Sequence, residues 1–153
     1  MQQADVAVEQ VLQQENRVAD LNEYEMFVQS KLSEPSRDMT VMLESLTGLQ
    51  EAGDKLGVRI PELLTAAVGL TAEAGEFDEI VKKMIFQGKP LDEANHTHLK
   101  KELGDLMFYV MVACMALGVT GDEIIEMNKD KLGGRYVAGF TVNESENRAD
   151  GDL

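Results

Sequence analysis

The fold is decided by residues 62–118, which read ELLTAAVGLTAEAGEFDEIVKKMIFQGKPLDEANHTHLKKELGDLMFYVMVACMALG. This stretch contains two acidic pairs, Glu-Ala-Gly-Glu at 73–76 and Glu-Leu-Gly-Asp at 102–105, each spaced i, i+3. On an α-helix such positions lie on one face, so each pair directs its carboxylates to one side. Gly88-Lys-Pro90 lies between the pairs and predicts a turn, because glycine ends helices and proline cannot continue one. We therefore predict an antiparallel helical hairpin.

The two arms of this hairpin have matching lengths. Glu76 to Gln87 and Asp92 to Glu102 each correspond to about 15–17 Å of helix axis. Antiparallel packing would bring four carboxylates, those of Glu73, Glu76, Glu102 and Asp105, to one level. Clustered acids repel one another unless cations lie between them, so the pattern predicts a metal site. Ligands that are all oxygen favour Mg²⁺ or Mn²⁺.

Two other interpretations of the acidic pairs remain open from the residues alone. Acids at i, i+3 commonly form a solvated helix face, and structural salt bridges would also account for them. Gly75 and Gly104 favour a site, because glycine within a helix is unfavourable and indicates close approach of a backbone or ligand. Neither His96 nor His98 stands three residues after one of the four acids, so a ferritin-like di-iron bundle is disfavoured.

The remainder of the chain also predicts helices, and we expect one all-α domain over residues 1–153. Its hydrophobic content is 44% of 153 residues, which is enough for a core. We expect an N-terminal extension over 1–20, a weak helical pattern to 32 that buries Phe27 and Leu32, and a helix from Met39 to about Ala52. Thr120 and Glu123 form a capping box for a helix that ends at Gly133–Gly134, and 137–153 read as an irregular tail.

The apolar residues of the hairpin predict a helical bundle that is completed by oligomerisation. The expected buried stripes are Leu63, Ala67, Leu70, Ala74, Phe77, Val81 and Met84 on the first arm, and Leu99, Leu103, Leu106, Val110, Ala113 and Leu117 on the second. The second arm is apolar on a further side through Met107, Met111, Cys114 and Met115. Because one chain has few helices to cover these faces, we expect a homodimer or tetramer.

Charge and composition limit the partners and the compartment. A net charge of −14 disfavours binding of duplex nucleic acid. The longest apolar run, 106–117, is too short to cross a bilayer, and the first residues show no signal-peptide pattern. One cysteine, Cys114, cannot form an internal disulfide and fits a reducing compartment. We expect a cytoplasmic protein, of a cell or an infected host cell, with no nucleic-acid or membrane partner.

The acidic motif and its surroundings resemble a known family. Glu-x-x-Glu, a gap of 25 residues and Glu-x-x-Asp on facing helices are similar to the signature of MazG-type all-α nucleoside triphosphate pyrophosphohydrolases. The resemblance, which covers about residues 24–152, extends to 63–77, 80–83, 87–91, 98–105, 128–136 and 147–152, and is strongest to small MazG-like proteins of bacteria and phages. The chain departs at Val137, where the family often has proline, and over residues 1–20.

This resemblance implies Mg²⁺-dependent hydrolysis of a (d)NTP between its α and β phosphates, giving a nucleoside monophosphate and pyrophosphate. Glu73, Glu76, Glu102 and Asp105 would bind the metal, Mn²⁺ being the alternative to Mg²⁺, and a metal-activated water would attack. Glu76 is our candidate for accepting the proton of that water, with Glu79 as the other candidate.

The resemblance also implies groups that hold the substrate. Lys83, Lys131 and Arg135 are candidates for the β and γ phosphates, and Asn128 and Tyr136 for further contacts with substrate. Ordinary surface charge is the other interpretation of the cations. Active sites of the family form near subunit contacts, so some of these groups would serve a neighbouring chain.

Two other functions remain open at this point. One is a relative with narrow specificity, such as a dUTPase-like or phosphoribosyl-ATP pyrophosphohydrolase. The other is a helical module that binds a nucleotide, including alarmones of the guanosine tetraphosphate type, without turnover. A substrate panel separates the first, and binding without product formation would identify the second.

Overall fold

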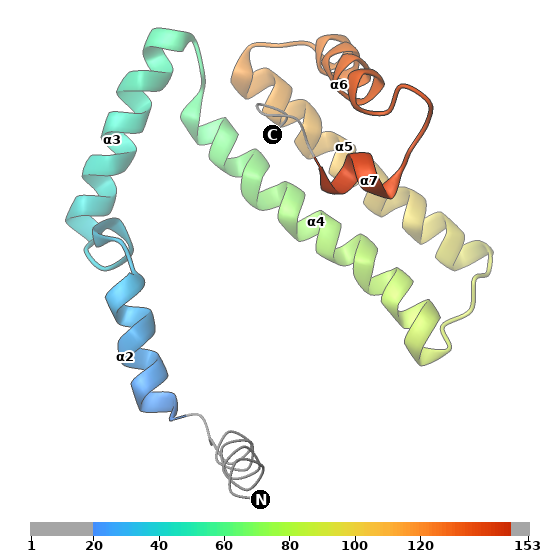
Figure 1. Cartoon of the computed structure of the whole chain (residues 1–153), viewed down its shortest axis with the longest axis horizontal. Helices are drawn as coiled ribbons and strands as arrows, with labels where there is room; N and C mark the ends of the chain where they lie inside the picture. Colours follow the sequence, from blue (N-terminus) through green and yellow to red (C-terminus); the bar gives the residue numbers. More distant parts are fainter. Residues whose placement is uncertain (1–19, 148–153) are drawn as a thin grey trace, which may run out of the picture. The chain divides into compact units, whose positions relative to one another are not determined.

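The computed structural model describes residues 20–147, and they form helices without strands. In chain order these are α2 (Leu21–Lys31), the 3₁₀-helix η1 (Glu34–Ser36), α3 (Met39–Leu56), α4 (Ile60–Gln87), α5 (Glu93–Leu117), α6 (Gly121–Arg135) and α7 (Val142–Glu146) (Figure 1). The all-α prediction is confirmed. A completed bundle and its oligomeric state stay predictions.

The chain divides into two compact units, Met1–Thr47 and Gly48–Leu153. In the described part of the first unit, α2 begins at Asp20, whose side chain accepts hydrogen bonds from the backbone N–H groups of Asn22 and Glu23. No residue of α2 is buried, and the predicted burial of Phe27 and Leu32 is wrong, since both are exposed. The expected extension over residues 1–20 lies outside the described residues except for Asp20. A single domain stays a prediction.

Helices α4 and α5 form the antiparallel pair of the second unit (Figure 1). Pro61 occupies the first turn of α4, where its missing N–H is not needed, and α4 ends at Gly88 with φ 69°. Asp92 caps α5 by accepting the backbone N–H of Asn95, and α5 ends at Gly118 with φ 71°. The predicted hairpin and the ends of its arms are therefore confirmed.

Arg59 fixes the open end of this hairpin. Its backbone N–H donates to the carbonyl oxygen of Ala116 at 2.8 Å, and its guanidinium donates to the carbonyl oxygen of Met115. Both acceptors lie in the last turn of α5, where carbonyl groups lack partners within the helix. Arg59 thus connects the beginning of α4 to the end of α5.

The buried face of α4 differs from the predicted stripe. The structure buries Ile60, Ala66, Gly69 and Ile80, whereas Ala67 and Ala74 of the predicted stripe are exposed. Small and apolar residues occupy most of the circumference of α4. Their helical spacing alone is therefore compatible with more than one buried face. On α5, Leu103 and Leu117 are also exposed, contrary to the prediction.

Three predicted boundaries also differ. Helix α3 continues through Gly53 to Leu56, and α6 continues through Gly133 and Gly134 to Arg135. The prediction of an irregular tail over 137–153 is wrong at α7, while 148–153 lie outside the described residues. Thr141 starts α7 because its hydroxyl oxygen accepts the backbone N–H of Glu144 at 3.2 Å. The hydroxyl also donates to Glu144 Oε2 at 2.6 Å.

Among residues 20–147, no single helix has both the length and the apolar composition needed to cross a membrane. The bent pair of α5 and α6, with 97° between the helices, meets that test by length and composition when both are taken together.

Candidate metal centre

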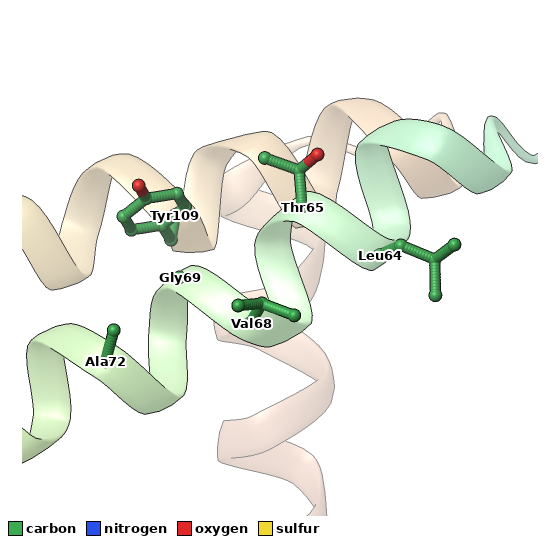
Figure 2. Close-up of a pocket in the computed structure, with 6 residues that line it drawn as sticks. All are labelled: Leu64, Thr65, Val68, Gly69, Ala72 and Tyr109. Atoms are coloured by element: carbon green, nitrogen blue, oxygen red, sulfur yellow. The ribbon is translucent and has the colours of Figure 1, made fainter. Parts of the chain in front are cut away.

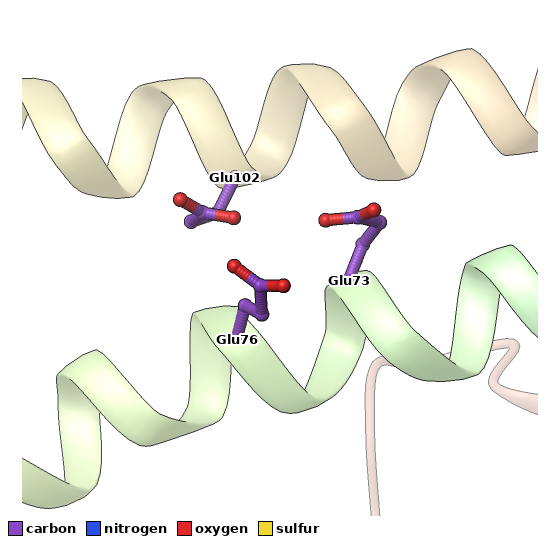
Figure 3. A group of neighbouring side chains, drawn as sticks. All are labelled: Glu73, Glu76 and Glu102. Carbon is purple, nitrogen blue, oxygen red and sulfur yellow. The ribbon is translucent and has the colours of Figure 1, made fainter.

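Three of the four predicted metal ligands converge between α4 and α5. Glu73 and Glu76 extend from α4 and Glu102 from α5, and the three side chains point toward one another (Figure 3). One carboxylate oxygen from each lies within 4.8 Å of the others. The hairpin and the spacing i, i+3 together produce this arrangement, because they place both members of the α4 pair opposite the same turn of α5. We call Glu73, Glu76 and Glu102 the acidic triad.

Asp105, the fourth predicted ligand, lies at the edge of the acidic triad. It is exposed, and its carboxylate is not among the three oxygens that come together. Its charge nevertheless contributes to raising the pKa of Glu73.

The electrostatic state of Glu73 shows how crowded these charges are. Its pKa is raised from the ordinary value of 4.5, first by partial burial and then by the neighbouring charges of Glu76, Asp105 and Glu102. Ionisation of Glu73 is thus less favourable in the folded protein alone than in the unfolded chain. A bound cation would reverse that effect by giving the charges a shared partner.

Glu102 is the buried member of the acidic triad, with 6% of its surface exposed. His98 lies one turn earlier on α5, and its Nε2 is 2.8 Å from Glu102 Oε1. The di-iron pattern places a histidine three residues after an acid, so it does not point to His98. The spacing of four between His98 and Glu102, which also puts two side chains on one helix face, is the signal that would have identified this contact.

Lys83, a predicted phosphate ligand on α4, is paired with Glu79. The Lys83 Nζ lies 3.2 Å from Glu79 Oε1, and Lys82 Nζ lies 3.9 Å from the same oxygen. The hydrogen bond and charge of Lys83 lower the pKa of Glu79, with Lys82 and Lys89 contributing. Glu79, the second candidate for proton acceptance, is therefore held in its ionised form.

The candidates on and after α6 lie far from the acidic triad of the same chain. Fifteen residues separate Glu102 from Leu117 at the end of α5, about 22 Å of helix axis. Helix α6 then leaves at 97°, so it does not return toward Glu102. Asn128 and Lys131 are exposed, Arg135 and Tyr136 are half-buried, and the Arg135 guanidinium carbon lies 5.7 Å from the centre of the Tyr136 ring. The structure does not bring these four residues to the acidic triad.

The glycines next to the acids do not mark a close backbone contact. A β-carbon at Gly75 or Gly104 would meet no atom within 4 Å among the described neighbours, so the predicted approach of a backbone is wrong, while approach of a ligand stays a prediction. The close contact is at Gly69, one turn before Glu73, where the ring of Tyr109 from α5 lies over the helix. Gly69 and Tyr109 line a shallow pocket with Leu64, Thr65, Val68 and Ala72 (Figure 2).

Comparison with known proteins identifies the family. Residues 61–140 match the MazG nucleotide pyrophosphohydrolase domain, which is more than half of the chain. The chain belongs to this MazG family. It is also 32% identical over 90 residues to the Gene 37 protein of Mycobacterium phage L5, covering 58% of this chain and 79% of the phage protein. No solved structure gave a significant match.

The MazG region runs from the start of α4 to the residues just before α7. It contains the acidic triad and Asp105, together with every residue predicted to bind substrate. The donor set suits a hard divalent cation, because it consists of carboxylate oxygens that repel one another without a positive charge. The MazG domain therefore carries an acidic cluster with the chemistry of a metal site.

Proposed function

We propose that the protein is a Mg²⁺-dependent pyrophosphohydrolase that converts a (d)NTP to a (d)NMP and pyrophosphate. The observation that carries this proposal is the convergence of Glu73, Glu76 and Glu102 from two antiparallel helices. The net charge of −14 adds a second argument, since a triphosphate is itself an anion and needs cations to bind such a protein. Membership of the MazG family supports the class of reaction.

The acidic triad and Asp105 would hold Mg²⁺, with Mn²⁺ as the alternative. When bound, the metal would neutralise the phosphates, polarise the α-phosphorus and lower the pKa of the attacking water. Asp105 is included because its charge already acts on Glu73, as the raised pKa of Glu73 shows.

Glu76 is the residue we assign to proton acceptance. It is the exposed member of the acidic triad, so a water molecule can reach its carboxylate. The water oxygen would bond to the α-phosphorus, its proton would pass to Glu76, and the bond from the α-phosphorus to the oxygen shared with the β-phosphorus would break. Glu79 is a weaker candidate, because Lys83 lowers its pKa and occupies its oxygen.

The pocket at Gly69 and Tyr109 is our candidate for the nucleoside end of the substrate. It lies one turn along α4 from Glu73, and its lining of Leu64, Val68 and Ala72 suits a base or a sugar better than a phosphate. Lys83 lies on the opposite side of the acids along α4, which suits the β and γ phosphates. Tyr109→Ala should then raise KM more than it lowers kcat.

We propose that a homodimer or tetramer completes the site. Large apolar side chains are exposed on the hairpin, among them Phe86 (78%), Phe108 (62%) and Met115 (53%). Such surface favours association. Lys131 and Arg135 are too distant from their own acidic triad, so a neighbouring chain would bring the equivalent residues to it. Mixing Glu102→Gln subunits with Arg135→Ala subunits should then restore activity that neither variant has alone.

Turnover assays with product analysis test the proposal. With Mg²⁺, the wild-type protein should release pyrophosphate from members of a panel of (d)NTPs. The substitution Glu73→Gln or Glu102→Gln should abolish this release. Glu126→Gln, an exposed acid on α6 that pairs with Lys129 at 2.8 Å, is the matched control and should retain activity. An active Glu73→Gln or Glu102→Gln enzyme would refute the assigned site. Nucleotide binding without product at saturating Mg²⁺ would indicate a non-catalytic module.

A further inference from the structure

His98 makes a close contact with the buried carboxylate of the acidic triad. Among residues 20–147, no other polar or charged residue reaches the burial of Glu102. A buried carboxylate is strongly unfavourable without hydrogen bonds or a counter-charge. The ring of His98 is placed to offset this cost, because its Nε2 lies 2.8 Å from Glu102 Oε1 while about half of its side chain, 49%, is exposed.

The chemistry of this contact follows from the groups involved. An ionised carboxylate can only accept hydrogen bonds, so the contact is favourable when Nε2 of His98 carries a hydrogen. This holds for the neutral and for the charged ring alike. With Oε1 engaged, rotation of the Glu102 carboxylate is restrained, and Oε2 keeps its full capacity for another partner.

We propose that His98 is a positioning residue that holds the Glu102 carboxylate in the orientation in which the acidic triad captures a divalent cation. The inference rests on the proposed function, since it assumes that the triad binds metal. Hydrogen-bond partners of ligating carboxylates restrict the ligand to its binding orientation, and their loss typically weakens metal affinity about 10–100-fold. His98 itself touches neither the cation nor the substrate.

Binding of Mn²⁺ to the full-length, metal-free protein provides the test, measured by electron paramagnetic resonance or calorimetry without any nucleotide. His98→Ala should weaken Mn²⁺ binding about 10–100-fold. His98→Gln should restore most of the affinity, because its amide donates from a similar reach. His98→Leu fills the volume without a donor. If truncation to alanine impairs folding, His98→Leu takes its place and should weaken Mn²⁺ binding to the same degree.

His96→Ala is the matched control. His96 lies two residues earlier on α5, about 200° around the helix axis, where it lines a shallow pocket with Leu91, Asp92 and Glu93. This variant should bind Mn²⁺ as the wild type does. In turnover assays, His98→Ala should raise the Mg²⁺ concentration needed for half-maximal rate far more than it lowers the rate at saturating Mg²⁺.

Three results would overturn the role of His98. One is Mn²⁺ affinity in His98→Ala equal to that of the wild type, and another is a His98→Gln variant as weak as His98→Ala. The third is a coupling between Mn²⁺ and a nitrogen nucleus in the pulsed electron paramagnetic resonance spectrum of the wild-type complex, which would make His98 a ligand. If the wild type itself fails to bind Mn²⁺, the proposed metal site falls as well. Wild-type binding with an unaffected His98→Ala variant removes the inference about His98 alone.

Discussion

The ring of Tyr109 on α5 lies so close to Gly69 on α4 that a β-carbon on Gly69 would overlap the ring (Figure 2). Glycine is therefore required for the two helices to keep their present separation at this point. Gly69 precedes Glu73 by one turn, and Tyr109 follows Asp105 by one turn. The contact consequently sets the spacing of the helices beside the acidic triad.

Gly69→Ala should destabilise the protein, although alanine favours helices more than glycine does. The added methyl group must displace the Tyr109 ring or separate α4 from α5, which typically costs about 1–3 kcal/mol. Denaturant unfolding measures the effect. Gly75→Ala is the matched control on the same helix, because its β-carbon would meet nothing within 4 Å. That variant should gain stability, by up to about 1 kcal/mol. Equal effects of the two substitutions would contradict the contact.

Arg59→Ala should loosen the open end of the hairpin. The substitution removes the hydrogen bond from the guanidinium to the Met115 carbonyl oxygen, and the Arg59 side chain is 51% exposed. Solvent screening limits the expected loss to about 1 kcal/mol in the free energy of unfolding. Lys129→Ala removes an exposed ion pair to Glu126 and should leave stability unchanged. A stable Arg59→Ala protein would show that its backbone bond to Ala116 is sufficient.

The ends of the hairpin were predictable because they depend on local signals. Pro61, Gly88, Asp92 and Gly118 each act within one helical turn, through a missing N–H, a positive φ or a side-chain cap. The meeting of Glu73, Glu76 and Glu102 followed from those ends. In two antiparallel arms, residues at the same distance from the turn lie opposite each other.

The packing face of α4 could not be predicted in the same way. It depends on the position of one ring, Tyr109, which selects Gly69 as the point of closest approach and leaves Ala67 and Ala74 exposed. The spacing of apolar residues along the sequence does not show where the Tyr109 ring packs. Asp105 as a fourth ligand stays a prediction: its carboxylate is not among the three oxygens that lie within 4.8 Å of one another, but its charge contributes to raising the pKa of Glu73.

Glu73→Gln should raise the thermal stability of the metal-free protein at neutral pH. The pKa of Glu73 in the folded protein lies above 4.5, so the folded state holds this proton more tightly than the unfolded chain does. Ionisation therefore lowers stability, with no effect below pH 4.5 and the full effect above the raised pKa. The advantage of the variant, seen in melting curves with chelator, should shrink as the pH falls toward 4.5.

Glu79→Gln provides the control of opposite sign for this pH dependence. Lys83 lowers the pKa of Glu79, so the stabilising contribution of that pair is present above the unfolded pKa and is lost as the pH falls through the folded pKa. The glutamine variant should show no stabilisation at neutral pH. A gain equal to that of Glu73→Gln would indicate a general effect of net charge instead of crowding within the acidic triad.

Mg²⁺ or Mn²⁺ should raise the melting temperature of the wild-type protein. A ligand that binds only the folded state at 100 times its Kd stabilises by about 2.7 kcal/mol. Glu102→Gln should lose this response, because it removes the charge of a ligand that the acidic triad needs. NaCl at the same ionic strength separates specific binding of the divalent cation from screening of the net charge. An equal response of the variant would place the metal elsewhere.

The most direct test of the central claim is hydrolysis of a dNTP with Mg²⁺ in water labelled with a heavy oxygen isotope, followed by mass analysis of both products. Attack at the α-phosphorus predicts that the label appears in the nucleoside monophosphate and that pyrophosphate is unlabelled. Label in the pyrophosphate, or release of a nucleoside diphosphate with inorganic phosphate, would contradict the proposed reaction.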